Sequence, residues 1–202
     1  MLDATARRLM DPTLNRMGAV IAERGYTANM VTMTGLALGL LAAVAIALGC
    51  PLLALAPLLA SRLADGLDGA VARATQKTDF GGYLDIAADF LFYGSIPLAF
   101  VIWNPTANGA AGAFLLASFY FNGTSFLGYA ILAEKRAMTT DAQGIKSLYF
   151  SNGLLEGTET IAFFVALCLF SGSFAVMAWV FGALCFASGG LRIWAARSVF
   201  GD

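Results

Sequence analysis

Four aspartates within residues 65–89 are the side chains of this sequence best suited to chemistry. The segment reads DGLDGAVARATQKTDFGGYLDIAAD and contains Asp65, Asp68, Asp85 and Asp89. The first two are spaced i,i+3 and the last two i,i+4, so each pair lies on one face of a helix. Carboxylates at the edge of apolar segments are costly and repel one another unless cations neutralise them. Because hard divalent cations prefer all-oxygen sites, the pattern predicts a site for Mg²⁺ or Mn²⁺, with one ion or two.

Small and basic residues beside the aspartates indicate a phosphorylated ligand. Gly66 and Gly69 carry no side chain, which would let a ligand approach the helix backbone closely. Arg73 follows Gly69 by about one helical turn and could bind a phosphate oxygen, while a pair of metal ions could clamp a pyrophosphate. The competing interpretation is a set of charges at a membrane surface, in which the acids form salt bridges with Arg62, Arg73 and Lys77.

The elements that must position these groups are predicted to be transmembrane helices. The sequence is 59% hydrophobic and only 12% charged, which is typical of an integral membrane protein. Apolar runs of roughly 20 residues, the length that crosses a bilayer, predict six spans at 29–49, 52–72, 83–103, 109–132, 153–170 and 174–195. A short polar turn makes the second and third spans antiparallel neighbours, so we expect the four aspartates at one depth.

The distribution of basic residues predicts the orientation in the membrane. The connectors at 50–51, 104–105 and 171–173 carry no charge, and all 12 Lys and Arg residues fall on the opposite side. By the positive-inside rule this charged side is cytoplasmic, and both termini lie there. We therefore expect an integral protein of the bacterial inner (cytoplasmic) membrane, with its site just below the cytoplasmic surface.

Residues 1–27 are predicted to form an amphipathic helix on the membrane surface, ahead of a six-helix bundle over 28–197. Apolar residues recur at helical spacing between arginines in this first segment. Asp11-Pro12 has the pattern of a helix start, with a capping residue followed by a first-turn proline. The alternative is a frayed polar tail. Residues 1–202 are thus expected to form one all-α membrane domain.

The aspartate segment follows a spaced pattern that extends beyond the acids themselves. The pattern D-x2-D-G-x2-A-R-x7-G-x3-D-x3-D is met by Asp65, Asp68, Gly69, Ala72, Arg73, Gly81, Asp85 and Asp89. It resembles the signature of the CDP-alcohol phosphotransferases (the CDP-alcohol phosphatidyltransferase family), although many members have a longer spacer after the arginine. The six-helix layout and the amphipathic N-terminal helix extend the resemblance over nearly the whole chain.

The resemblance implies a reaction and roles for residues. Members transfer a substituted phosphate from a CDP-linked alcohol, usually CDP-diacylglycerol, to a second alcohol and release CMP. By the same resemblance, two divalent cations would be held by Asp65, Asp68, Asp85 and Asp89. Contacts to the CDP moiety would come from Asp65, Asp68, Gly69 and Arg73. Catalysis would depend on Asp85 and Asp89, and Asp89 is either the general base as well as a ligand or a metal ligand only. The chain has no histidine, so a carboxylate must move any proton.

The start of the first predicted span is a second candidate contact to the nucleotide. Members of the family often carry Pro-Asn with a following Thr there; this chain has Ala28 in place of the proline but keeps Asn29 and Thr32. These two residues lie one turn apart and could both contact the CDP moiety. The alternative is that Thr27 or Asn29 only caps the helix.

Candidate acceptor contacts lie in the second half of the chain. Glu156 and Glu159 are one turn apart and could hydrogen-bond the hydroxyls of an acceptor, or instead pair with Arg136, Lys146 or Arg192. Arg136 and Lys146 could bind a phosphorylated acceptor such as glycerol 3-phosphate, or only satisfy the positive-inside rule. The acceptor is therefore left open among small polar and lipid alcohols.

A small ion-coupled transporter is the alternative from a different functional class. Transporters place acids near the bilayer midplane, often in broken helices, whereas these aspartates gather at one membrane face, which favours an enzyme. A non-catalytic member of the same fold is a further alternative, but no aspartate of the motif is missing.

The expected partners are a CDP-alcohol, an acceptor alcohol and membrane lipid, with no nucleic acid. The family resemblance also implies a homodimer. Gly35 and Gly39 form a GxxxG pattern, which we expect to serve helix packing within the chain.

Overall fold

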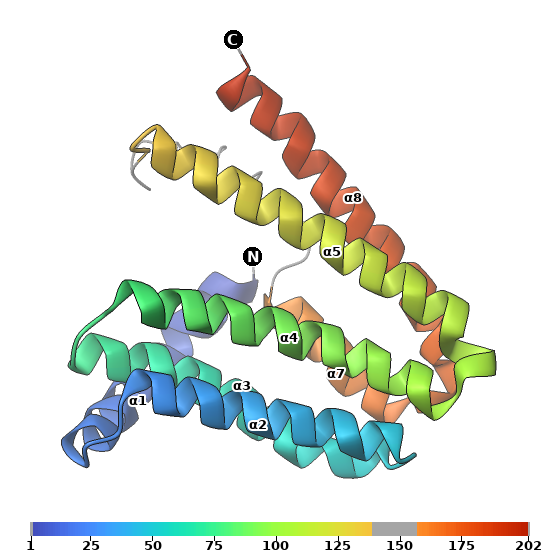
Figure 1. Cartoon of the computed structure of the whole chain (residues 1–202), viewed down its shortest axis with the longest axis horizontal. Helices are drawn as coiled ribbons and strands as arrows, with labels where there is room; N and C mark the ends of the chain where they lie inside the picture. The colour runs from blue at the N-terminus through green and yellow to red at the C-terminus, as the bar shows by residue number, and fades with distance from the viewer. Residues whose placement is uncertain (1, 139–156, 202) are drawn as a thin grey trace.

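Residues 2–138 and 157–201 are described by the computed structural model of the chain, with side chains from residue 11 onward. Every regular element in these two ranges is a helix, which confirms the predicted all-α fold. The elements are α1 (Leu2–Glu23), α2 (Ala28–Ala47), α3 (Pro51–Ala74), α4 (Asp79–Trp103), α5 (Pro105–Lys135), α7 (Gly157–Leu169), the short 3₁₀ helix η1 (Ser171–Ser173) and α8 (Phe174–Phe200) (Figure 1).

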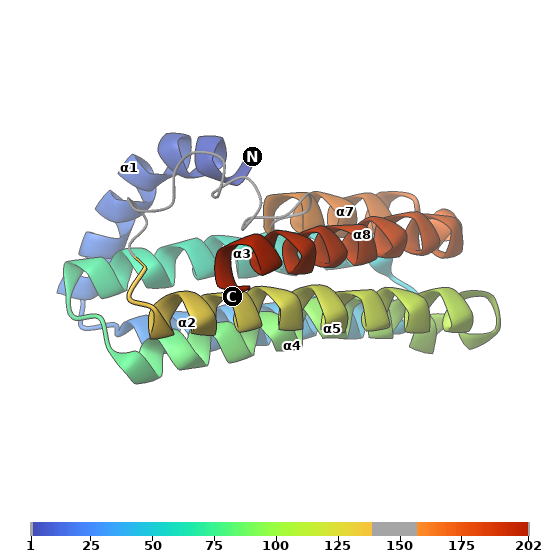
Figure 2. The ribbon, with the colours of Figure 1, turned by 90° about the horizontal axis from the view of Figure 1, so that it is seen from above.

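Two groups of helices meet at one end of the molecule and separate toward the other (Figure 1). Helix α2 packs against both α3 and α4, and α7 lies against α3. Helix α1 crosses the C-terminal half of α3 (Figure 2). Helices α5 and α8 pack on each other, and α5 is joined to α4 through the turn at Asn104. The aspartate motif therefore lies at the end where the two groups are apart, because α3 ends and α4 begins there.

Within residues 2–138 and 157–201, four helical segments are long and apolar enough to cross a membrane: α2, α4, α5 and Ser171–Phe200. Helix α3 has 24 residues, but Arg62, Asp65, Asp68 and Arg73 fall inside it. Helix α7 is apolar and has 13 residues within the described range. Four of the six predicted spans thus meet the length and composition of a membrane helix, and the spans assigned to α3 and α7 stay predictions.

The N-terminal segment is helical from Leu2, so the predicted helix start at Asp11-Pro12 is wrong. Pro12 lies inside α1, although a proline removes one backbone donor from a helix and disfavours the helical conformation of the residue before it. Gly18 lies where a Cβ atom would be 2.6 Å from the Cβ of Ala70, so α1 can contact α3 closely there. The position of α1 at a membrane surface stays a prediction.

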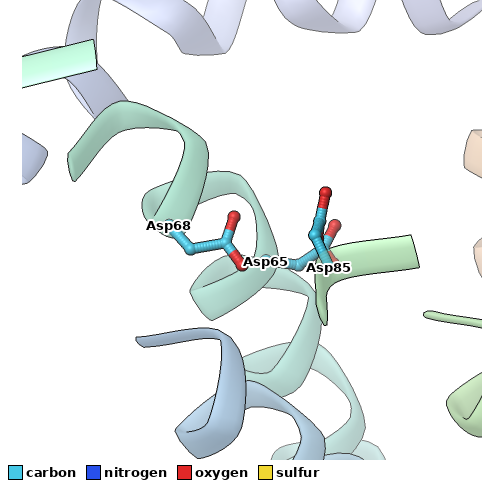
Figure 3. A group of neighbouring side chains, drawn as sticks. All are labelled: Asp65, Asp68 and Asp85. Atoms are coloured by element: carbon cyan, nitrogen blue, oxygen red, sulfur yellow. The ribbon is translucent and has the colours of Figure 1, made fainter. Parts of the chain in front are cut away.

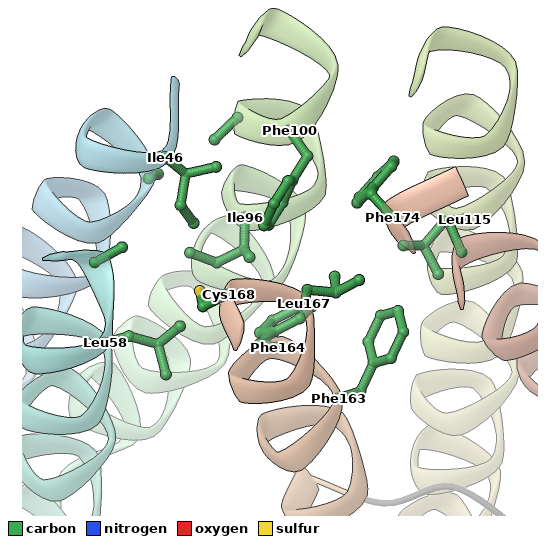
Figure 4. Close-up of a cluster of buried hydrophobic side chains, with 14 of the residues drawn as sticks. Ile46, Leu58, Ile96, Phe100, Leu115, Phe163, Phe164, Leu167, Cys168 and Phe174 are labelled. Atoms are coloured by element: carbon green, nitrogen blue, oxygen red, sulfur yellow. The ribbon is translucent and has the colours of Figure 1, made fainter. Parts of the chain in front are cut away.

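The apolar core joins α2, α3, α4, α5, α7 and α8 around a group of phenylalanines (Figure 4). Phe92, Phe100, Phe164 and Phe174 are fully buried there. Gly39 of α2 lies where a Cβ atom would be 2.5 Å from Cδ2 of Phe92, so only glycine lets α2 approach α4 this closely. Gly35 is buried against Ala64 of α3, and the expected use of this GxxxG pattern within the chain is confirmed.

Candidate metal and substrate site

The two helices that carry the aspartates are joined by a short turn, as the sequence predicts. Helix α3 ends at Ala74 and α4 begins at Asp79. The hydroxyl of Thr78 accepts a hydrogen bond from the backbone N–H of Gly81 at 3.0 Å, which caps α4. This cap fixes the start of α4, so Asp85 and Asp89 lie near its beginning and face the last turns of α3.

Three carboxylates converge between α3 and α4 (Figure 3). Asp65, Asp68 and Asp85 each offer one oxygen, and these three atoms lie within 4.8 Å of one another. Asp68 is 6% exposed, while Asp65 and Asp85 are half-buried. Three carboxylate oxygens at this separation fit a hard divalent cation, which prefers oxygen ligands. The residues that would hold such an ion are therefore these three.

Thr32 of α2 orients one of these carboxylates. Its hydroxyl lies 2.7 Å from Oδ2 of Asp68 and 3.1 Å from the backbone oxygen of Ala28. Thr32 is buried, so the bond to Asp68 is shielded from water. Hydrogen bonds of this kind hold ligating carboxylates in place in metal sites. The sequence predicted Thr32 as a contact of the nucleotide, whereas its partner in the structure is the carboxylate.

Asp89 lies outside the group of three and is paired with Arg62. The Nη1 atom of Arg62 is 2.8 Å from Oδ1 of Asp89 and 3.4 Å from Oδ1 of Asp65. The Arg62 side chain is only 9% exposed, and its guanidinium carbon lies 3.8 Å from the centre of the Phe92 ring. The ion pairs of the motif aspartates within the described part of the chain all involve this one arginine.

Arg73, the other arginine expected near the acids, bonds to α1 instead. Its Nε and Nη2 atoms donate to Oδ1 of Asn15 at 3.1 and 2.8 Å. Gly69 lies where a Cβ atom would be 3.3 Å from Nη1 of Arg73, so the missing side chain leaves room for the guanidinium. Asn15 was not predicted as a site residue, because nothing in its local sequence indicates a contact with a residue so far along the chain.

Three further small or polar residues near the motif have neighbours in the structure. Gly66, expected to admit a ligand, lies against Leu14 of α1, where a Cβ atom would be 3.1 Å from Cδ1. The hydroxyl of Thr27 accepts a bond from the N–H of Met30, so Thr27 is the cap of α2. Asn29 is half-buried beside Gly81 at the start of α4 and so lies near the turn between the two aspartate helices.

The predicted acceptor residues are only partly described. Arg136 donates to the backbone oxygens of Val199 and Phe200, both at 3.1 Å, and so ties the end of α5 to the end of α8. Glu159 is half-buried in the first turn of α7. Lys146 and Glu156 lie outside the described residues.

A second polar group lies between α5 and α8. The Nη1 atom of Arg192 is 2.9 Å from Oδ1 of Asn122 and 2.6 Å from Oγ of Ser125. Arg192 is 3% exposed and lines a cavity of about 310 Å³ with Phe121, Thr124 and Tyr129 among others. The sequence predicted Arg192 only as a partner for glutamates, and its bonds to α5 were missed because they join residues far apart in sequence.

The sequence of this chain is similar to those of known proteins. The family model for CDP-alcohol phosphatidyltransferase matches residues 25–194, a range that contains all four aspartates. The inner membrane protein YnjF of Escherichia coli K12 is 45% identical over 194 residues, covering 96% of this chain and 94% of that protein. The archaetidylinositol phosphate synthase of Pyrococcus horikoshii is 32% identical over 147 residues, covering 67% and 78% of the two chains.

Proposed function

We propose, because this chain belongs to the CDP-alcohol phosphatidyltransferase family, that it transfers a substituted phosphate from a CDP-linked alcohol to an acceptor alcohol and releases CMP. The chain is an integral membrane protein with four apolar helices of spanning length, which suits a lipid-linked donor such as CDP-diacylglycerol. The observation that carries the proposal is the convergence of Asp65, Asp68 and Asp85 within 4.8 Å between two antiparallel helices.

The reaction is a displacement at one phosphorus atom. The acceptor's hydroxyl oxygen forms a bond to the phosphorus that carries the lipid alcohol. The bond between that phosphorus and the bridging oxygen of CMP breaks, and the bridging oxygen keeps the electron pair. Asp89 takes the proton of the acceptor hydroxyl, since no histidine is present to do so. Asp85 and Asp89 are the catalytic residues of this proposal.

The metal-binding residues of the proposal are the aspartates of the motif. Asp65, Asp68 and Asp85 hold Mg²⁺ or Mn²⁺, with Asp89 beside them, and two ions are proposed. Bound divalent cations would offset the negative charge of the pyrophosphate as CMP leaves. The bond from Thr32 to Asp68 supports this role, because it fixes one carboxylate in the orientation that a ligand needs.

The donor's phosphates are proposed to lie along α3. Arg73 is exposed at the end of this helix and its guanidinium is held by Asn15, so it is pre-oriented to bind a phosphate oxygen. Gly69 keeps the helix surface open beside it. Asn29 is near the turn between α3 and α4 and is a further candidate contact for the CDP moiety.

The acceptor is a small polar or lipid alcohol. The Pyrococcus relative is a synthase of archaetidylinositol phosphate, which makes inositol phosphate a candidate beside glycerol 3-phosphate. Arg136, Lys146, Glu156 and Glu159 are the candidate acceptor contacts. We further propose that the enzyme is a homodimer and that its site and both termini face the cytoplasm, as the distribution of Lys and Arg favours.

The test is CMP release from CDP-diacylglycerol by the purified protein in detergent, with Mg²⁺ or Mn²⁺. Glycerol 3-phosphate, inositol phosphate, serine, inositol and phosphatidylglycerol are offered as acceptors, and EDTA and Asp68→Asn serve as controls. We expect release with one acceptor class that EDTA and the substitution both abolish. An absence of metal-dependent release with every acceptor contradicts the proposal.

A further inference from the structure

Arg62 is a buried cation in the middle of the aspartate motif, and the proposed reaction gives it no task. Its side chain is 9% exposed, and it comes from α3 one turn before Asp65. One nitrogen, Nη1, lies 2.8 Å from Oδ1 of Asp89 and 3.4 Å from Oδ1 of Asp65. Arg62 therefore joins Asp89 of α4, which lies outside the group of three carboxylates, to Asp65 of α3, which belongs to that group.

The position of this guanidinium is fixed by its surroundings on three helices. Its carbon lies 3.8 Å from the centre of the Phe92 ring, and Nη2 donates to Oγ of Ser61 at 3.1 Å. Phe92 is fully buried and packs edge-on against Phe164 of α7. Gly39 makes room for this arrangement, since a Cβ atom there would be 2.5 Å from the Phe92 ring and 3.0 Å from Oγ of Ser61. An arginine that is stacked on an aromatic ring and bonded through both terminal guanidinium nitrogens has little freedom to move.

We propose that Arg62 is a positioning residue, which holds the Asp89 carboxylate where it can take the proton of the acceptor hydroxyl. This rests on the proposed function above. A general base must lie within hydrogen-bond reach of the proton that it removes, so an error of about 1 Å in its position is costly. Asp89 stands on a helix surface with three other carboxylates nearby, which would push an unrestrained carboxylate away. Arg62 counters that repulsion and fixes one oxygen of Asp89.

The proton-transfer step is the one through which Arg62 acts. The O–H bond of the acceptor breaks, the proton goes to Asp89, and the oxygen's electron pair forms the bond to phosphorus. Arg62 touches none of these reacting atoms. Its loss should therefore lower kcat much more than it changes the KM for the CDP-linked donor, because Gly69 and Arg73, along which the donor's phosphates are proposed to lie, are two to three turns further along α3.

The experiment compares Arg62→Met, Arg62→Lys, Asp89→Asn and the double variant Arg62→Met/Asp89→Asn in the full chain. Arg24→Met, at an exposed arginine beyond α1, is the matched control for loss of one positive charge. We expect Arg62→Met to lower kcat by about 100-fold, within the range of a general base. The kcat of Arg62→Lys should lie between those of Arg62→Met and the wild type, because lysine keeps the positive charge but lacks the planar guanidinium group. The double variant should be no slower than Asp89→Asn, since both changes act through one carboxylate.

A second measurement, of metal binding, shows whether Arg62 positions Asp89 or instead supports the carboxylates that hold the metal. Binding of Mn²⁺ to each purified variant is measured by electron paramagnetic resonance. Removing a cation beside three carboxylates should leave Mn²⁺ affinity unchanged or raise it, whereas Asp65→Asn should lose binding. A fall in Mn²⁺ affinity of Arg62→Met that matches its fall in kcat overturns the proposal.

The other possible outcomes of the kinetic experiment also decide whether Arg62 positions Asp89. Wild-type turnover in both Arg62 variants, or losses that multiply in the double variant, overturn the positioning role and leave the proposed function intact. An absence of CMP release by the wild type instead refutes the proposed function. Arg62→Met leaves Asp89 without its partner; if that variant does not fold, Arg62→Lys and the double variant, whose pair is neutral, carry the test.

Discussion

The helix group α2–α3–α4 and the helix pair α5–α8 both hold a buried arginine, but they use it differently. In the first group, Arg62 bonds to carboxylates from two helices, beside three convergent aspartates. In the pair, Arg192 bonds to the neutral side chains Asn122 and Ser125 and lines an apolar cavity. Opposed charges arranged around a shared centre indicate a site for cations and their ligands, whereas the bonds from Arg192 to Asn122 and Ser125 join α8 to α5. Within the described residues, the carboxylates close enough together to hold a metal ion lie in the first group, and the predictions below test whether metal binding depends on that group.

The largest effect is expected at the centre of the first group. Asp85→Asn removes one carboxylate of the three and should lower CMP release by at least about 1000-fold, the upper end of what one electrostatic group contributes. Asp79→Asn, an exposed position in the first turn of the same helix, should keep activity. The measurement is turnover of folded, purified protein. Near-wild-type turnover of Asp85→Asn would remove Asp85 from the site.

A smaller effect is expected where α2 supports the carboxylates. Thr32→Val removes the hydroxyl that bonds Oδ2 of Asp68 and should weaken Mn²⁺ binding by about 10–100-fold. Thr34→Val is the matched control, because the Thr34 hydroxyl bonds only to the backbone of its own helix. Titration of Mn²⁺ into both variants checks this. Equal affinities would mean that Asp68 needs no support from α2.

A still smaller effect is expected at the edge of the first group, where α1 contacts α3. Asn15→Leu removes the acceptor of two bonds from Arg73 and should raise the KM for CDP-diacylglycerol several-fold, as loss of about 1 kcal/mol would do. Thr13→Ala, exposed on the same helix, is the control. A donor KM that changes with Arg73→Ala but not with Asn15→Leu would show that Arg73 binds without help from α1.

The smallest effect on the metal site is expected from the helix pair. Arg192→Met leaves oxygens of Asn122 and Ser125 without this donor and should lower the thermal unfolding temperature of the protein. Because this bond lies outside the aspartate group, Mn²⁺ affinity should stay at the wild-type value. A parallel loss of Mn²⁺ affinity would break the division between the two regions.

The sequence predicted what depends on local spacing. The intervals within Asp65–Asp68 and Asp85–Asp89, with a short turn between them, were enough to place carboxylates of α3 and α4 together. Three of the four carboxylates converge, whereas the spacing alone contains no signal that separates Asp89 from the other three. Arg62 and Arg73 are three helical turns apart on nearly the same face of α3, so the pattern of one helix does not show which of them pairs with the acids. The neighbouring helices decide it, since α4 brings Asp89 to Arg62 and α1 brings Asn15 to Arg73.

Contacts between distant segments were the part that could not be predicted. Asn15 and Arg73 meet because Gly18 allows α1 to pack closely on α3. The same packing explains Gly66, which was expected to admit a ligand and instead faces Leu14. The prediction of a helix start at Asp11 is wrong because a proline is common in the first turn of a helix, and the local sequence does not show that α1 runs through Pro12 from Leu2.

The most direct test of the account is anomalous diffraction at the manganese edge from crystals grown with Mn²⁺ and CDP-diacylglycerol. The account predicts an anomalous peak within coordination distance of carboxylate oxygens of Asp65, Asp68 and Asp85, with the pyrophosphate against it. The absence of a peak there, at a Mn²⁺ concentration that supports CMP release in solution, would contradict the central claim that these carboxylates form the catalytic metal site.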